Sequence, residues 1–247
     1  MLKLKIMKKT FLPILIFVMP LLSVAQGDMN DGKLQDYKII TGRFEGGSAE
    51  QQGAYAQLFG ADDTQRKFNL YFHWYNIAHE YSHCLLDFYC KSVGGVEEEM
   101  LANKFAVAYW RAAGFADELS TLKSILDGAL SAFPNPVPEG KTFTDWYTEI
   151  WGTEQLMNAA VYGYFQFKSV LIAMDDADDL TQWFANVGID GFSMPNGCQS
   201  KKYPVEAEAA ADVLNDLQQF FKASGLEPPT VGLDLTNDPM THRSQKM

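Results

Sequence analysis

HEYSH, residues 79–83, lies in a stretch from residue 64 to residue 89 that contains neither proline nor glycine. The apolar residues around it have helical spacing, which predicts a helix over residues 74–89. On a helix, residues four apart lie on one face and one turn apart, so His79 and His83 are expected to point the same way. Two imidazoles in this arrangement can bind a single metal ion.

Glu80 gives the histidine pair a chemical role. It directly follows His79, so its carboxylate would project beside an ion held by His79 and His83. There it can take a proton from a metal-activated water and later deliver it to a leaving amine. The alternative interpretation is a helix that merely carries two surface histidines and binds no metal.

A third ligand is expected from a second helix. The glycines at 94–95 permit a turn, and residues 96–113 predict a helix that returns alongside the first. Catalytic zinc commonly takes three protein ligands and keeps a fourth position open. We expect Glu99 to be the third ligand, because its face carries small alanines that let two helices approach closely. The neighbouring Glu97 and Glu98 are expected to be exposed at the helix start, where acids interact favourably with the helix dipole.

Together, the two segments resemble a known family. HEYSH, followed 16 residues after its last histidine by EMLAN at 99–103, is similar to the gluzincin branch of the zincin metallopeptidases. The resemblance covers about residues 74–110. It implies a set of zinc-site residues: the ligands His79, His83 and Glu99, the general base Glu80, and Asn103, which would orient His79. Many members have an aspartate where this chain has Asn103, whose amide oxygen accepts a hydrogen bond but carries no charge.

The remaining patterns predict a mainly α fold of the α+β class, with a zincin-like helical core and room for a small β-sheet. Residues 37–44 alternate weakly and suggest an edge strand, whereas residues 68–73 form either a strand or the first turns of the metal-site helix. Ser48 and Gln51 form a capping-box pattern before a helix over residues 49–59. Further helices are expected over residues 118–133, 154–174, 179–186 and 205–224.

The amino terminus is typical of an export signal. Lysines precede the apolar run FLPILIFVMPLL, and the small residues at 23–25 follow it as a cleavage site. The apolar run is shorter than the roughly 20 residues that span a bilayer. We therefore expect a signal peptide over residues 1–25, one metallopeptidase domain over residues 26–226, and an extended or disordered tail over residues 227–247. The mature protein is expected in the periplasm or outside the cell, and not as an integral membrane protein.

Composition limits the partners. Without the four lysines of the leader, 16 basic residues face 31 acidic ones. A chain with this much negative charge repels the phosphate backbone of nucleic acids. We therefore do not expect nucleic acid as a partner. The expected partner is a peptide or protein substrate, and the predicted function is that of an exported zinc metallopeptidase. The alternatives are a catalytically inactive zinc-binding protein on the same scaffold and a helical interaction protein without metal; the sequence leaves the oligomeric state open.

Other residues have weaker claims to a role in the site. Cys84, Cys90 and Cys198 allow one disulfide and a free thiol, and Cys84 is expected to pack in the core. Asp87 lies four residues after His83 on the same helix face. It either forms a hydrogen bond to one of the metal ligands or is an exposed acid. His73 is expected to point away from the metal face.

Two further groups of residues complete the candidates. A donor for a developing oxyanion is expected from one of three residues: Tyr162, Tyr164 or His242. Four acids lack the glycine and later glutamate of an EF-hand loop and indicate a capped, solvated turn: Asp175, Asp176, Asp178 and Asp179.

The first testable prediction concerns the leader. Export should remove residues 1–25, because small residues precede the expected cleavage point. Amino-terminal sequencing of the exported protein should therefore begin at Gln26. A mature protein that still begins at Met1 would contradict this prediction.

Overall fold

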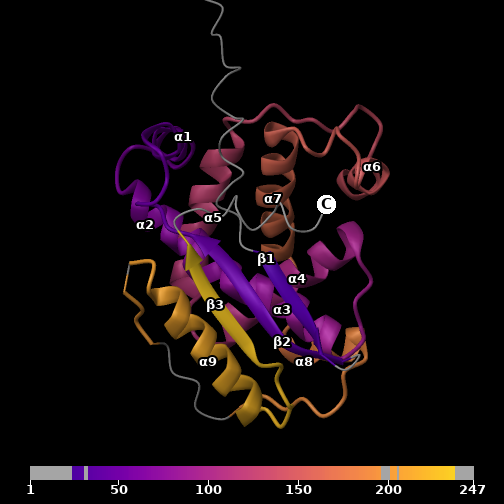
Figure 1. Cartoon of the computed structure of the whole chain (residues 1–247). Coiled ribbons are helices and arrows are strands. Elements are labelled where there is room, and N and C mark those ends of the chain that lie inside the picture. The colour runs from indigo at the N-terminus through magenta and orange to yellow at the C-terminus, as the bar shows by residue number, and fades with distance from the viewer. Residues whose placement is uncertain (1–23, 31–32, 196–200, 205, 237–247) are drawn as a thin grey trace, which may run out of the picture.

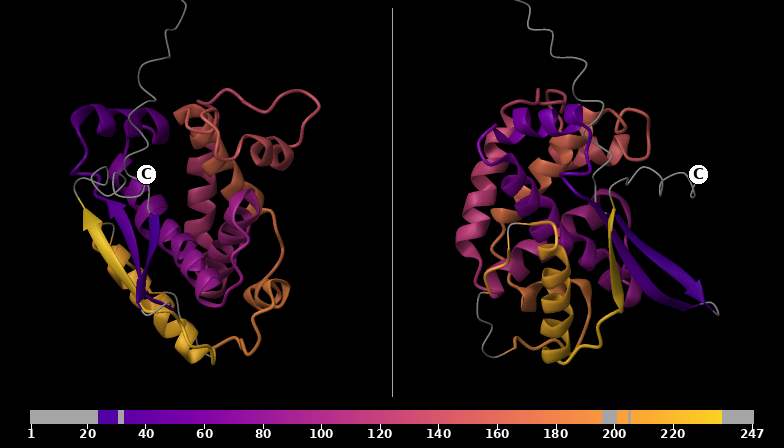
Figure 2. Two further views of the ribbon diagram at one scale, coloured as in Figure 1. Left: turned by 45° about the vertical axis from the view of Figure 1, so that its right-hand side comes forward. Right: turned by 60° about the vertical axis from the view of Figure 1, so that its left-hand side comes forward.

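The computed structural model describes residues 24–30, 33–195, 201–204 and 206–236. These residues form a mainly helical body with a small β-sheet on one side (Figure 1). The mainly α class with a small sheet, expected from the sequence, is thus confirmed. Two turned views show that the helices lie behind one face of the sheet, while its other face points away from them (Figure 2).

In sequence order, the helices and strands of the described chain are β1 (Val24–Asn30), β2 (Lys33–Gly42), α1 (Ala49–Phe59), α2 (Thr64–Asn69), the π-helical segment η3 (Leu70–Tyr75), α3 (Asn76–Phe88), α4 (Gly95–Ala112), α5 (Ala116–Leu130), α6 (Phe143–Ile150), α7 (Ala159–Met174), α8 (Leu180–Val187), α9 (Ala209–Ala223) and β3 (Val231–Thr236). Helix α3 carries the HEYSH residues. It packs against α4, α9 and the strands β1 and β2.

The sheet corrects two expectations. Its order is β1-β2-β3, with β2 antiparallel to β1 and parallel to β3, so the strand expected at an edge is central. Its second neighbour comes from residues 231–236, which were expected in the tail. Val231 is buried, and Tyr37 donates its backbone N–H to the carbonyl of Thr230 as the two strands begin to pair. This part of the expected tail therefore belongs to the domain, while residues 237–247 lie outside the described residues.

β1 lies at the open edge of the sheet and packs against α3. Cleavage after Ala25 would remove the first two residues of this strand. The remaining part, residues 26–30, retains its partners in β2, from Lys38 to Lys33. The expected cleavage site is therefore compatible with the sheet.

Most helices follow the sequence patterns. Before α1, the Ser48 hydroxyl accepts from the backbone N–H of Gln51, and the Gln51 side chain accepts from the backbone N–H of Ser48, so the expected capping box is confirmed. Asp179 and Gln182 cap α8 in the same way. The helices expected over residues 96–113, 118–133 and 205–224 correspond to α4, α5 and α9.

Other boundaries differ from the patterns. Residues 68–73 are helical, as the end of α2 and most of η3, which decides between the two alternatives left open by the sequence. The helix expected over residues 154–174 begins later, at α7, because the Asn158 side chain caps its first turn by accepting two backbone N–H groups. Helix α6 lay outside every expected helix, although Thr142 caps it by accepting from the backbone N–H of Asp145 at 3.1 Å.

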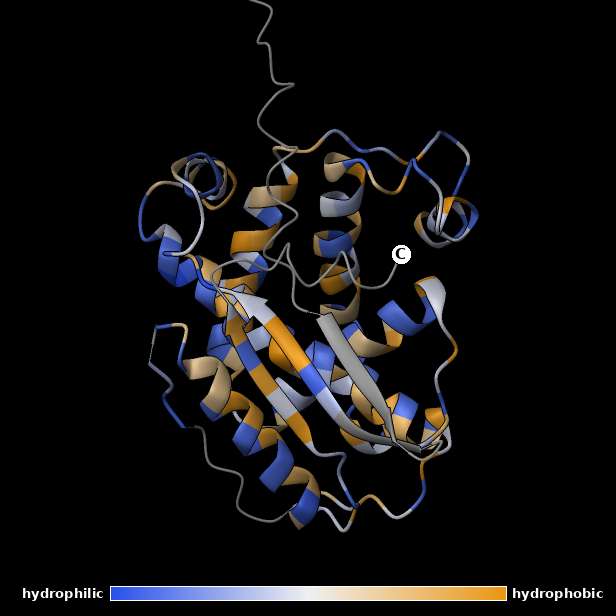
Figure 3. Cartoon of the chain, in the orientation of Figure 1, coloured by the Kyte–Doolittle hydropathy of each residue, from blue (hydrophilic) through white to orange (hydrophobic). Residues whose placement is uncertain are grey.

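Aromatic residues dominate the core around α3. Five consecutive residues of η3, from Tyr71 to Tyr75, are buried, and their rings contact residues of α1, α4 and α7. Figure 3 shows hydrophobic and hydrophilic residues mixed along the helices. Within the described residues, no helix combines the length and apolar composition needed to cross a membrane.

His73 is a core residue that joins η3 to the sheet. It is fully buried, with Nε2 3.0 Å from the carbonyl oxygen of Gly42 and Nδ1 2.8 Å from Oδ1 of Asn69. Because the Gly42 carbonyl only accepts, Nε2 donates to it, and Nδ1 of the neutral ring accepts when the Asn69 amide is turned so that its Nδ2 group faces the ring. Burial lowers the pKa of His73 to about 4, so the imidazole is neutral at pH 7. The expectation that His73 points away from the metal face is confirmed.

The second prediction follows from this buried histidine. In the unfolded chain its pKa is about 6.5, so between that pH and about 4 the unfolded state binds more protons than the folded state. The free energy of unfolding should therefore fall as the pH drops through this range, by about 3 kcal/mol from His73. Urea unfolding of the wild type and of His73→Gln at several pH values measures the difference. Parallel pH profiles of the two proteins would contradict the assignment.

Candidate metal centre

The centre forms where α3 and α4 run side by side in opposite directions. Gly94 and Gly95, both with positive φ, make the turn between the two helices, a conformation that glycine adopts without strain. On α4, Ala102 and Ala106 are fully buried. Small side chains allow helix backbones to approach closely, and α4 brings Glu99 to the HEYSH face.

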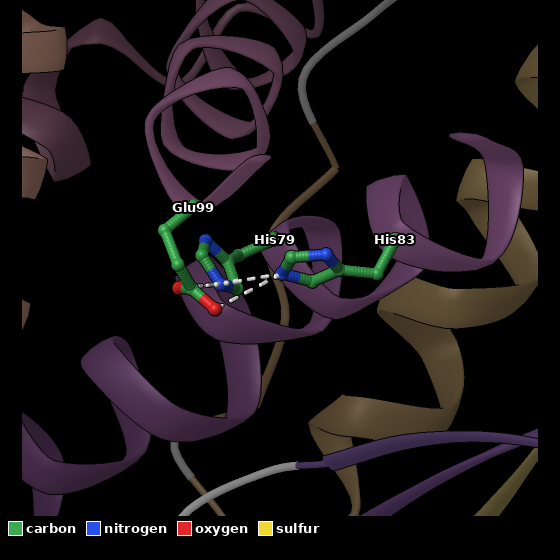
Figure 4. Close-up of side chains that lie close together, drawn as sticks. All are labelled: His79, His83 and Glu99. Carbon is green, nitrogen blue, oxygen red and sulfur yellow. Dashed lines mark hydrogen bonds and ion pairs between the residues drawn. The ribbon is translucent and has the colours of Figure 1, made fainter. Parts of the chain in front are cut away.

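Three side chains converge at one point, His79 and His83 from α3 and Glu99 from α4 (Figure 4). The Nε2 atoms of the two imidazoles lie 3.2 Å apart. The Glu99 carboxylate oxygens lie 3.4 Å from Nε2 of His79 and 3.7 Å from Nε2 of His83. Within the described residues, these three form the one group of histidine, cysteine and acidic side chains close enough to bind a metal ion. The structure thus brings together the three residues that the sequence predicted as ligands.

These distances match a zinc coordination sphere. Zinc binds imidazole nitrogen and carboxylate oxygen at about 2.0–2.2 Å, so two ligand atoms at a tetrahedral angle lie roughly 3.3–3.6 Å apart. The separations between the two Nε2 atoms and the Glu99 oxygens lie close to this range. Two nitrogens and one carboxylate are also a donor set that zinc uses in catalytic sites.

Asn103 fixes the orientation of His79. The Asn103 Nδ2 group donates to the backbone carbonyl of Glu99 and to the Ser169 hydroxyl, which leaves Oδ1 as the acceptor facing the other way. That oxygen lies 3.1 Å from Nδ1 of His79 and accepts from the Tyr75 hydroxyl at 3.0 Å. Nδ1 of His79 therefore carries the proton, and Nε2 presents its lone pair to the centre. Asn103 thus occupies the position expected of it.

Glu98 fixes the orientation of His83. It is partly buried, which corrects the expectation that it is exposed. One Glu98 oxygen lies 2.9 Å from Nδ1 of His83, and the other accepts from the Ser92 hydroxyl and from the backbone N–H groups of Val93 and Gly94. The bond with His83 is the main reason that the pKa of Glu98 falls to about 2. Glu97 is exposed, as expected.

The two oriented imidazoles create a need for a cation. When both Nδ1 atoms donate, both Nε2 atoms of the neutral rings carry lone pairs, and lone pairs 3.2 Å apart repel each other. A positive ion between them and the Glu99 carboxylate would remove this repulsion. The donor atoms therefore fit a divalent metal ion.

Glu80 lies on the same helix with its side chain buried. Its residue is 8% exposed, and Asn76, one turn earlier, donates from Nδ2 to one carboxylate oxygen at 3.3 Å. Of the three candidate donor side chains, His79 is 6% exposed, whereas His83 is 17% and Glu99 is 20% exposed. Solvent therefore reaches the group on the side of His83 and Glu99.

The weaker candidates are placed as follows. Cys84 is buried in the core, where burial raises the pKa of its thiol well above the ordinary value. Asp87 accepts a hydrogen bond from the Tyr37 hydroxyl at 3.3 Å and so contacts β2. Tyr162 accepts from Gln166 on α7, and its role as an oxyanion donor stays a prediction, as does that of Tyr164. Cys198 and His242 lie outside the described residues.

The acids after α7 have structural partners. Asp176 forms an ion pair with Lys104 at 2.6 Å, and its backbone carbonyl accepts from Arg111. Asp178 accepts from the Asn186 amide, and Asp179 caps α8. These bonds are those of the capped turn that the sequence indicated.

The third prediction uses the three consecutive glutamates as a matched series. Glu99→Ala removes a metal ligand and should weaken zinc binding at least about 100-fold, as should His79→Ala or His83→Ala. Glu98→Ala removes the partner of His83, together with the acceptor for the turn at residues 92–94, and should weaken binding about 10- to 100-fold. Glu97→Ala changes an exposed side chain and should leave affinity unchanged. Competition with a chromophoric chelator measures the zinc affinity of the three glutamate variants. A greater loss of zinc affinity in Glu98→Ala than in Glu99→Ala would show that the wrong glutamate is assigned as the ligand.

Comparisons with protein-family models, with curated proteins and with solved structures found no match. The resemblance to gluzincins therefore rests on the motif residues between His79 and Asn103. The function of the chain has to be argued from the chemistry of its own side chains.

Proposed function

We propose that this chain is an exported zinc-dependent metallopeptidase. The observation that carries the proposal is the convergence of two lone-pair nitrogens and one carboxylate on a single point, with a hydrogen-bond partner behind each imidazole. Such partners fix the ring orientation and tautomer of metal-binding histidines.

Three protein ligands suit a catalytic rather than a structural zinc site. Structural zinc sites are closed by four protein ligands, and cysteine is common among them, whereas catalytic sites use three and leave one position open. Zinc in such a site lowers the pKa of water and polarises a carbonyl group. In the described residues no cysteine joins the three donor side chains, and two of the three are partly exposed.

Glu80 is the residue that we propose to move the proton. As the neighbour of His79 on α3, it would project beside an ion held by His79 and His83, and the Asn76 amide donates to its carboxylate. Its carboxylate would accept a proton from the attacking water and return it to the leaving amine. Asn76 donates to one carboxylate oxygen and so helps to orient the Glu80 side chain.

A peptide substrate fits the arrangement of the sheet. β1 lies against α3, and in the described part of the chain no other strand pairs with its outer edge. An extended peptide can add to such an edge through main-chain hydrogen bonds. The peptide would then run beside the helix that carries His79 and His83. We therefore favour peptide bonds over other hydrolysable groups as the substrate.

One observation favours the alternative, a zinc-binding protein without catalytic activity. Glu80 is less accessible than His83 or Glu99. A general base must come within hydrogen-bond reach of the proton it abstracts, although the distance often shortens only when substrate is bound. Zinc binding without hydrolysis of any peptide would support this alternative.

The fourth prediction separates the two functions through Glu80→Gln. Glutamine has nearly the same shape, so the variant should fold and bind zinc like the wild type. It cannot accept a proton, and peptide hydrolysis should fall roughly 100- to 10,000-fold. A peptide library first identifies a substrate for the wild type, and kcat and zinc content are then compared. Equal kcat values would refute the proposed base, while loss of zinc would show that Glu80 holds the site together.

A further inference from the structure

A second concave site lies away from the metal centre. It is a cavity of about 350 Å³ between α2, η3, the first turn of α5 and the loop at 202–203. This volume falls within the range of small-molecule sites in proteins, about 300–1,000 Å³. None of its lining residues belongs to the metal centre.

The cavity has an aromatic wall. Leu70, Trp74 and Tyr203 form its apolar part, and the rings of Trp74 and Tyr203 meet edge to face with centroids 5.2 Å apart. Most of the Trp74 side chain is buried, so the wall has a fixed shape and offers apolar contact to a ligand.

Charges of both signs line the rest of the cavity. Arg66 and Lys202 supply cations, and Asp117 and Glu118 supply anions from the first turn of α5. Within the described part of the chain, Arg66 pairs at 3.7 Å with Asp63, outside the cavity, and no ion pair joins the cavity's cations to its anions. These four charges are therefore available to a ligand that carries both signs.

We propose that this cavity binds a small zwitterion with an apolar side chain, such as a free amino acid or a short peptide. The ligand's carboxylate would meet Arg66 and Lys202, and its ammonium group would meet Asp117 and Glu118. Its apolar side chain would lie against Trp74 and its neighbours. A ligand with one charge would leave one pair of protein charges unmatched. The proposal is independent of any activity at the metal centre.

The experiment measures binding of phenylalanine and its three capped forms by isothermal titration calorimetry, with EDTA present so that no ligand binds through a metal ion. N-acetylphenylalanine keeps only the negative charge, phenylalaninamide keeps only the positive charge, and N-acetylphenylalaninamide has neither. Free phenylalanine should bind at least about tenfold more tightly than either singly charged form, because each charged group forms charge-assisted hydrogen bonds. The neutral form should bind most weakly.

Two variants locate the bound ligand. Glu118→Gln should weaken binding of phenylalanine and phenylalaninamide about tenfold and leave N-acetylphenylalanine unchanged, and Lys202→Gln should show the reverse selectivity. Glu139→Gln and Lys222→Gln remove exposed charges outside the cavity and should bind like the wild type.

Three results would overturn the proposal. The first is no binding of phenylalanine or of short peptides at millimolar concentrations. The second is equal affinity for all four forms, which would mean that charge is not recognised. The third is binding that persists in Glu118→Gln and Lys202→Gln but is lost in His83→Gln, which would place the ligand at the metal centre.

Discussion

The close packing of α3 against α4 is the constraint on which the rest of the structure depends. Ala102 and Ala106 leave room for the helix backbones to approach, and the Asn103 side chain then forms hydrogen bonds with both of its ends. A buried amide that loses its partners costs about 1–3 kcal/mol. A shift of α4 along α3 would break these bonds and move Glu99 away from His79. The contacts that hold the two helices together are therefore the same contacts that arrange the donor atoms.

The π-helical segment connects this interface to the rest of the core. Tyr75 donates to the Asn103 amide oxygen, and Tyr71 donates to Gln166 on α7 at 3.3 Å. Trp74 lies between these two tyrosines in the sequence, and its ring packs against Trp110 and Tyr203. π-helical turns inside helices often occur near functional sites. Here the segment brings one hydrogen-bond donor to α4 and another to α7 while its rings stay buried.

The parts of the site that could be predicted from the sequence depend on local geometry. His79 and His83 face the same way because they lie four residues apart on one helix, whatever surrounds it. Glu99 could be chosen because alanines share its face and two glycines precede its helix. The capping box at Ser48 is local in the same sense, and it was found at the expected residues. Each of these inferences needs only the helix repeat and the chemistry of a few neighbouring side chains.

The parts that were missed depend on contacts between distant segments. β3 pairs with β2 across almost the whole chain, and no local pattern identifies residues 231–236 as the partner that makes β2 central. Glu97, Glu98 and Glu99 have identical side chains and differ only by steps of about 100° around α4. The Ser92–Gly94 turn, which offers a hydroxyl and two N–H groups, draws Glu98 inward, where its second oxygen reaches His83. A glutamate run at a helix start indicates exposure on average, but the direction of each side chain depends on which donors the tertiary structure places around it.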